Sequence, residues 1–114
     1  MARPVVGIYA SVAPVSWGPW VDRPSVLAPA ALGEAVQRAG AMAVLLAPDP
    51  ELDRPELLGM LDALVAFDDA AGVEALIGAA RERGVAVVVL DAERVTPAAS
   101  VEDFGRELAG LLAA

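Results

Sequence analysis

The chain has 114 residues and a formal net charge of −8, and it contains neither cysteine nor histidine, which excludes catalysis by a thiolate or an imidazole of this chain. Apolar residues make up 57% and charged residues 21%, so the chain is a single folded domain and not a disordered linker. The negative charge disfavours nucleic acid and anionic lipid as partners, because the arginines are scattered from Arg3 to Arg106 and form no basic stretch.

The first third of the sequence predicts a strand, a loop and a helix. Residues 5–10 are a short apolar run rich in β-branched side chains, which is typical of a strand buried on both faces. Residues 11–24 are rich in proline and tryptophan, and we expect a loop there. Residues 26–39 then place apolar side chains at fourfold spacing before Gly40, which predicts a helix with a glycine stop.

The middle of the sequence continues this alternation. Residues 42–47 predict a second strand that Pro48 ends, and residues 55–61 predict a short helix with a proline in its first turn. Residues 63–67 predict a third strand, which two acidic residues follow.

The last third predicts two helices around a strand. The residues from 73 onward show an apolar helical stripe that Gly84 closes, and residues 85–90 are the clearest strand in the chain. Ser100, with an acid three residues later, predicts the start of a final helix. Its buried stripe is expected to be Phe104, Leu108, Leu111 and Leu112.

Four strand-helix units with short connections predict an α/β fold with a parallel sheet. We expect a single domain over residues 1–114: a three-layer, doubly wound, flavodoxin-like sheet of about four strands in the order 2-1-3-4. The fourth strand, residues 85–90, is then an edge, and a bare apolar edge is prone to aggregation. Either the final helix or a second chain must cover it, so we predict a homodimer or another protein partner.

The sequence also predicts a cellular setting and the absence of a cofactor. No apolar run is long enough to span a membrane, and no basic, apolar leader precedes Val5. With no cysteine to suggest an oxidising compartment, we expect a cytoplasmic protein. No glycine follows the first strand until Gly18, which disfavours a phosphate-binding loop, and we predict no cofactor.

Polar residues gather near the expected carboxyl ends of the strands, where ligands of doubly wound folds bind. They are Ser11, Asp49, Asp68, Asp69, Asp91, Glu93 and Arg94. One interpretation is a divalent-cation site or a carboxylate pair for acid-base chemistry, and the other is that these acids cap helices or are solvated loop charges. No spaced ligand motif is present, so we predict no metal site.

Trp17 and Trp20 are the best candidates for a contact surface, with Ser11 and Arg94 as further candidate binding residues. Rigid aromatic side chains in a long loop supply contact area at low entropic cost. The alternative is that one or both tryptophans fold back as a lid on the local core.

The order of several segments carries a resemblance to a known family. The segments are RPVVGI at 3–8, WGPW at 17–20, LAP at 27–29, AVQRAG at 35–40, VLLAP at 44–48 and LDALV at 61–65. In this order they resemble the class I glutamine amidotransferase-like family, most closely its gamma-glutamyl-gamma-aminobutyrate hydrolase (peptidase C26-like) branch. The resemblance is good over residues 3–67 and weak over residues 73–91.

The resemblance implies that the catalytic residues are missing. The family has a cysteine nucleophile between glycines on a strand-to-helix elbow, where this chain has Asp91 between Val89 and Glu93. Asp68 and Asp69 stand where the family has its oxyanion glycines, and carboxylates there would oppose a developing oxyanion. The family's histidine has no counterpart.

The resemblance thus implies a catalytically inactive binding or assembly module. Two alternatives stay open. One is the non-catalytic half of a split amidotransferase or amidohydrolase, which a partner chain completes with cysteine and histidine. The other is a small carboxylate- or metal-dependent hydrolase centred on Asp68, Asp69 and Asp91.

Overall fold

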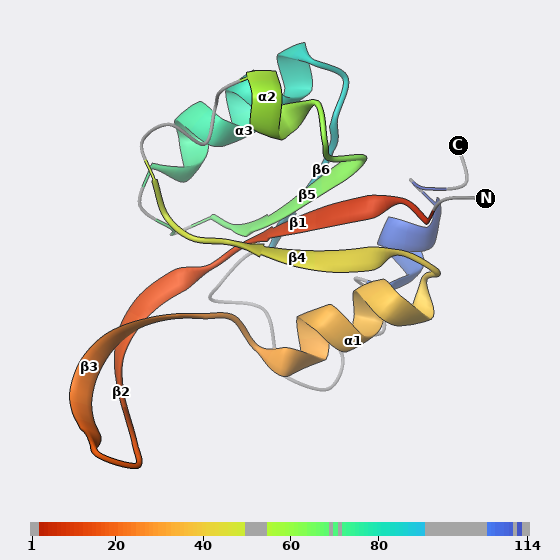
Figure 1. The fold of residues 1–114 in the computed structure, drawn as a ribbon. Coiled ribbons are helices and arrows are strands. Elements are labelled where there is room, and N and C mark those ends of the chain that lie inside the picture. The colour runs from red at the N-terminus through yellow and green to blue at the C-terminus, as the bar shows by residue number, and fades with distance from the viewer. Residues whose placement is uncertain are drawn as a thin grey trace.

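A four-stranded parallel sheet forms the body of the protein in the computed structural model, which describes residues 3–49, 55–68, 70, 72–90, 105–110 and 112. The strands are β1 (Val5–Tyr9), β4 (Met42–Leu46), β5 (Ala63–Phe67) and β6 (Ala86–Leu90), in the order β4-β1-β5-β6 (Figure 1). The α/β class and the parallel sheet are confirmed. Counting only the four strands that the sequence predicts, the order reads 2-1-3-4.

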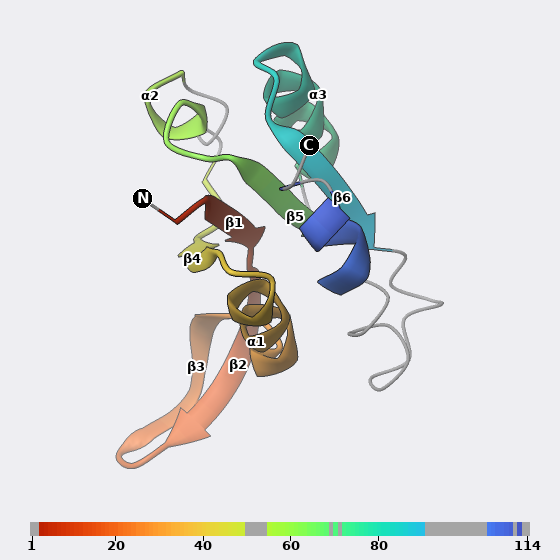
Figure 2. The ribbon, with the colours of Figure 1, turned by 90° about the vertical axis from the view of Figure 1, so that its right-hand side faces the viewer.

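Helices cover both faces of the sheet and make three layers. The helix α1 (Ala30–Arg38) lies on one side, and α2 (Pro55–Leu58) and α3 (Val73–Glu82) lie on the other (Figures 1 and 2). Residues 105–110 are also helical, and Leu108 packs into the core under α1. None of the helices in these described ranges is long and apolar enough to span a membrane.

The central strand β1 supplies side chains to both cores. Val6 and Ile8 are buried among the residues of α1, whereas Tyr9 belongs to the core under α2 and α3. Gly7 lies between Val6 and Ile8 in the strand, and a Cβ atom on Gly7 would meet Leu46 Cδ1 at 2.9 Å and Leu61 Cδ1 at 3.0 Å. The absence of a side chain at residue 7 therefore lets two buried leucines close over the strand.

Asp62 ties three strands together at the amino edge of the sheet. Its Oδ2 accepts the N–H of Val5 at 2.7 Å, and its own N–H donates to the carbonyl of Val5 at 2.8 Å. The carbonyl of Asp62 accepts the N–H of Ala86 at 3.3 Å. This residue fixes the position of β1 relative to β5 and β6.

The predicted loop over residues 11–24 is wrong. Residues 11–27 form an antiparallel hairpin of β2 (Ser11–Trp17) and β3 (Trp20–Leu27), which we call the arm and which extends away from the body (Figure 1). The following helix consequently begins at Ala30 and not at residue 26.

The prolines that suggested a loop are placed where a hairpin tolerates them. Pro14 lies directly opposite Pro24. Neither residue has an N–H to donate, so the pair fits only a position whose backbone groups point away from the partner strand. Gly18 turns the chain with a φ of 54°, a left-handed value that glycine adopts without strain.

We expect Gly7→Ala to lower the free energy of unfolding by about 1–3 kcal/mol, because the added methyl group must displace Leu46 and Leu61. Urea denaturation measures this change. Gly78→Ala in α3 is the matched control, since its added Cβ meets no atom within 4 Å beyond the adjoining residues and the backbone of its own helix. It should be neutral or stabilising by up to about 1 kcal/mol. An equal loss in both variants would contradict the packing described.

Candidate functional site

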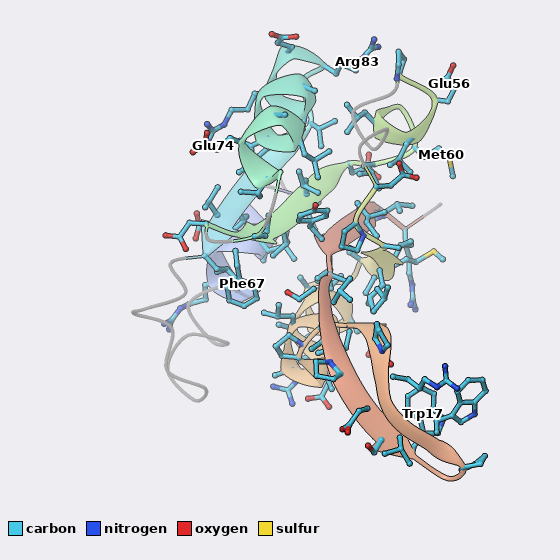
Figure 3. The ribbon with its side chains drawn as sticks, turned by 90° about the vertical axis from the view of Figure 1, so that its left-hand side faces the viewer. Trp17, Glu56, Met60, Phe67, Glu74 and Arg83 are labelled. Carbon is cyan, nitrogen blue, oxygen red and sulfur yellow. The ribbon has the colours of Figure 1, made fainter. Side chains whose placement is uncertain are left out.

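The tip of the arm carries an exposed aromatic pair. The rings of Trp17 and Trp20 stack with centroids 6.0 Å apart and an interplanar angle of 22°. The guanidinium carbon of Arg23 lies 5.1 Å from the Trp20 ring centroid, within cation–π range. Trp17 is 54% exposed and Trp20 is 47% exposed, and Figure 3 shows Trp17 near the tip of the arm, well away from Met60 on the body.

A bulge in β3 brings these three side chains together. Val15 lies opposite Arg23, but Trp17 lies opposite Trp20, so β3 holds one more residue than β2 between the two pairs. Asp22 has a φ of 49°, and its N–H donates to Ser16 Oγ at 2.9 Å. The bulge is thus stabilised locally and directs Arg23 and Trp20 to the same side of the arm.

The other face of the arm is also apolar. Residues directly opposite each other share a face, and Val12 lies opposite Val26 next to the Pro14–Pro24 pair. Val12 is 58% exposed and Val26 is 45% exposed. The two strands of the arm contact mainly each other. A two-stranded hairpin alone is marginally stable in water, so apolar surface on both faces favours a partner that covers it.

The arm is electrically neutral in an acidic protein. Its only charged residues are Asp22 and Arg23, so the net charge of −8 lies in the rest of the chain. A partner that covers the arm meets a single acid, Asp22, so little of the cost of desolvating charged side chains is incurred there.

The acidic edge of the sheet forms a shallow hollow. Asp68 follows β5, and its N–H donates to the carbonyl of Leu90 at 2.9 Å. A hollow of about 340 Å³ lies beside it, next to the start of α3. Its lining residues are Asp68, Ala70, Gly72, Val73, Glu74 and Ala75.

The structure brings together only some of the predicted site residues. Trp17 and Trp20 meet, whereas Ser11 lies opposite Leu27 at the other end of the arm. Asp69, Asp91, Glu93 and Arg94 lie outside the described residues. Among the residues that are described, no group of three or more acidic, histidine or cysteine residues is placed to hold a metal ion.

Arg23 is the site residue that sequence reasoning missed. The signal was present, because Val12, Val15, Val21 and Val26 are β-branched residues typical of strands. The prediction of a loop over residues 11–24 excluded a hairpin, and the bulge that places Arg23 on the tryptophan face depends on the pairing of β2 with β3.

No family profile, curated protein or solved structure matches the chain. The resemblance to the amidotransferase-like family therefore stays a prediction. The arm tip is the best-defined part of the candidate site.

If the tryptophans form a surface and not a lid on the core, the double variant Trp17→Ala/Trp20→Ala should change the free energy of unfolding by less than about 1 kcal/mol. Ile8→Ala, a buried control in β1, should cost about 2–5 kcal/mol. Urea denaturation followed by far-ultraviolet circular dichroism measures both. A loss in the double variant as large as in Ile8→Ala would favour the lid.

Proposed function

We propose that the protein is a catalytically inactive, amidotransferase-like binding or assembly module whose contact surface is the arm tip. The observation that carries the proposal is the half-exposed Trp17–Trp20 stack with Arg23 over it. Tryptophan and arginine are the residues most enriched among those that dominate binding energy at protein interfaces. Because the bulge holds all three in place before binding, little conformational entropy is lost when a partner docks.

The inactive character of the module rests on the composition and on the predicted resemblance. A chain without cysteine or histidine lacks the nucleophile and the base of the amidotransferase reaction. The carboxylate of Asp68 at the carboxyl end of β5 is ill suited to stabilise an oxyanion. The proposal includes a flavodoxin-like topology, a cytoplasmic setting, and a second copy or another protein as the partner.

Photo-cross-linking from the arm tests the proposed surface. A photoreactive amino acid at Val21, which is 67% exposed beside the tryptophan pair, should capture a discrete protein in cells that naturally contain this chain. The same group at Met60 on the body, which is 68% exposed, is the matched control and should not capture it. Adding Trp17→Ala/Trp20→Ala should lower the yield at least about 30-fold, since loss of the stacked pair as one aromatic anchor costs about 2 kcal/mol or more.

Different results would contradict the two parts of the proposal, the contact surface and the inactive character. Equal capture from Val21 and Met60 would contradict the arm as the contact surface. A capture yield from Val21 that is unchanged in Trp17→Ala/Trp20→Ala would contradict it as well. Turnover of glutamine or of gamma-glutamyl substrates by the purified chain, surviving rigorous removal of contaminants, would contradict the inactive character.

Two other functions stay predictions, and the same experiments separate them. A captured partner that brings a cysteine and a histidine, and that hydrolyses glutamine only together with this chain, would favour the split enzyme. Hydrolysis that requires magnesium, manganese or calcium and is lost in Asp68→Asn would favour the carboxylate- or metal-dependent enzyme.

A further inference from the structure

The outer strand β4 exposes large apolar side chains on both of its faces. Met42 is 51% exposed, Val44 is 39% exposed and Leu45 is 49% exposed. Met42 and Val44 lie on the same face as Leu46, which belongs to the core under α2 and α3, and Leu45 lies on the face of α1. On β6, the other outer strand, only Val89 is a large hydrophobic side chain this exposed.

The backbone of β4 directs part of its hydrogen-bonding groups to the outer side of the sheet, where no described strand pairs with them. Met42 donates its N–H to the carbonyl of Pro4 at 2.8 Å, and the carbonyl of Leu46 accepts the N–H of Ala10 at 3.0 Å. Since backbone groups of successive strand residues point to opposite sides, Ala43 and Leu45 direct their N–H and C=O groups away from β1. Within the described residues, no strand lies on that side.

No residue of β4 blocks pairing of this edge with another strand. Natural edge strands usually carry a charge, a proline or a bulge that blocks pairing with another chain. Residues 41–47 contain neither a charge nor a proline, although the whole chain carries −8. The edges of the arm, by contrast, are interrupted by Pro14 and Pro24. Two acidic copies can therefore meet along β4 without bringing charged side chains of the strands together.

We propose that β4 pairs antiparallel with β4 of a second copy, around a two-fold axis at Val44, and joins two four-stranded sheets into one of eight strands. Ala43 then lies opposite Leu45 of the second copy and exchanges both backbone hydrogen bonds with it. Val44 lies opposite its own equivalent. The same surface serves both copies, so the assembly closes as a dimer.

This arrangement covers each of the exposed side chains of β4. Met42 lies opposite Leu46 of the second copy on one face, and Leu45 lies beside Ala43 of the second copy on the other. The paired strands are only about 17 Å long, so the interface is small and the dimer should be reversible, with a dissociation constant of about 1–100 μM. The inference deepens the assembly function proposed above but does not use the arm.

A charge-swap experiment tests the register. Sedimentation velocity at about 100 μM should show at least about half of the wild-type chains as dimer, and V44E and V44K each as a monomer, because residue 44 faces itself across the axis. An equimolar mixture of V44E and V44K should restore the dimer. V89E on β6 is the matched control, with a similarly exposed valine in the other outer strand, and should dimerise like the wild type.

A cysteine variant gives a second readout that does not depend on a disruptive charge. The chain has no cysteine, so V44C provides one thiol per copy. In a non-hydrogen-bonded antiparallel pair the two Cα atoms are about 4.5 Å apart, a separation that a disulfide spans. Air oxidation should give a covalent dimer from V44C but not from M60C, whose side chain is exposed on the body (Figure 3).

The outcomes distinguish this inference from the role of the arm. Trp17→Ala/Trp20→Ala should leave the V44C cross-link unchanged, whereas it should lower capture from Val21 at least about 30-fold. A wild type that remains monomeric at about 100 μM would overturn the β4 pairing and leave the arm surface standing. Three other results would also overturn the β4 pairing. They are dimerisation of V44E at the wild-type level, loss of dimerisation in V89E, and equal cross-linking of V44C and M60C.

Discussion

The structure depends on the burial of β1 between two cores. Val6 and Ile8 fill one core and Tyr9 belongs to the other, while Gly7 leaves room for the leucines that close over the strand. The chain continues past Ala10 into the arm, and no residue of the arm belongs to either described core. One nearly continuous stretch is therefore buried in its first part and exposed in its second, and the exposed part carries the candidate site.

Two exposed surfaces follow from this arrangement, and they differ in what they offer a partner. The arm presents side chains on its faces, and Pro14 and Pro24 interrupt its backbone edges, so it suits docking through the Trp17–Trp20 stack. The outer side of β4 presents backbone groups at Ala43 and Leu45 and suits pairing with another strand. A neutral arm and a charge-free strand are also the surfaces where an acidic chain meets least repulsion.

The sequence predicted the body well because short apolar runs between glycine and proline stops mark buried parallel strands. It failed at the arm, since Pro14 and Pro24 signal a loop when read singly but are tolerated in a hairpin at a position whose backbone groups point away from the partner strand. The role of Asp62 was also hidden, because it depends on the register of three strands. The predictions for Asp69, Asp91 and Arg94 lie outside the described residues.

Residue-resolved amide hydrogen exchange on dilute protein determines whether the arm is a hairpin outside both cores. We expect the amides of Val6, Ile8 and Val65 to be the best protected, and those of residues 11–27 to exchange at least about tenfold faster through opening of the arm alone. Protection of the arm equal to that of β1 would contradict it, because the hairpin would then unfold only together with the core.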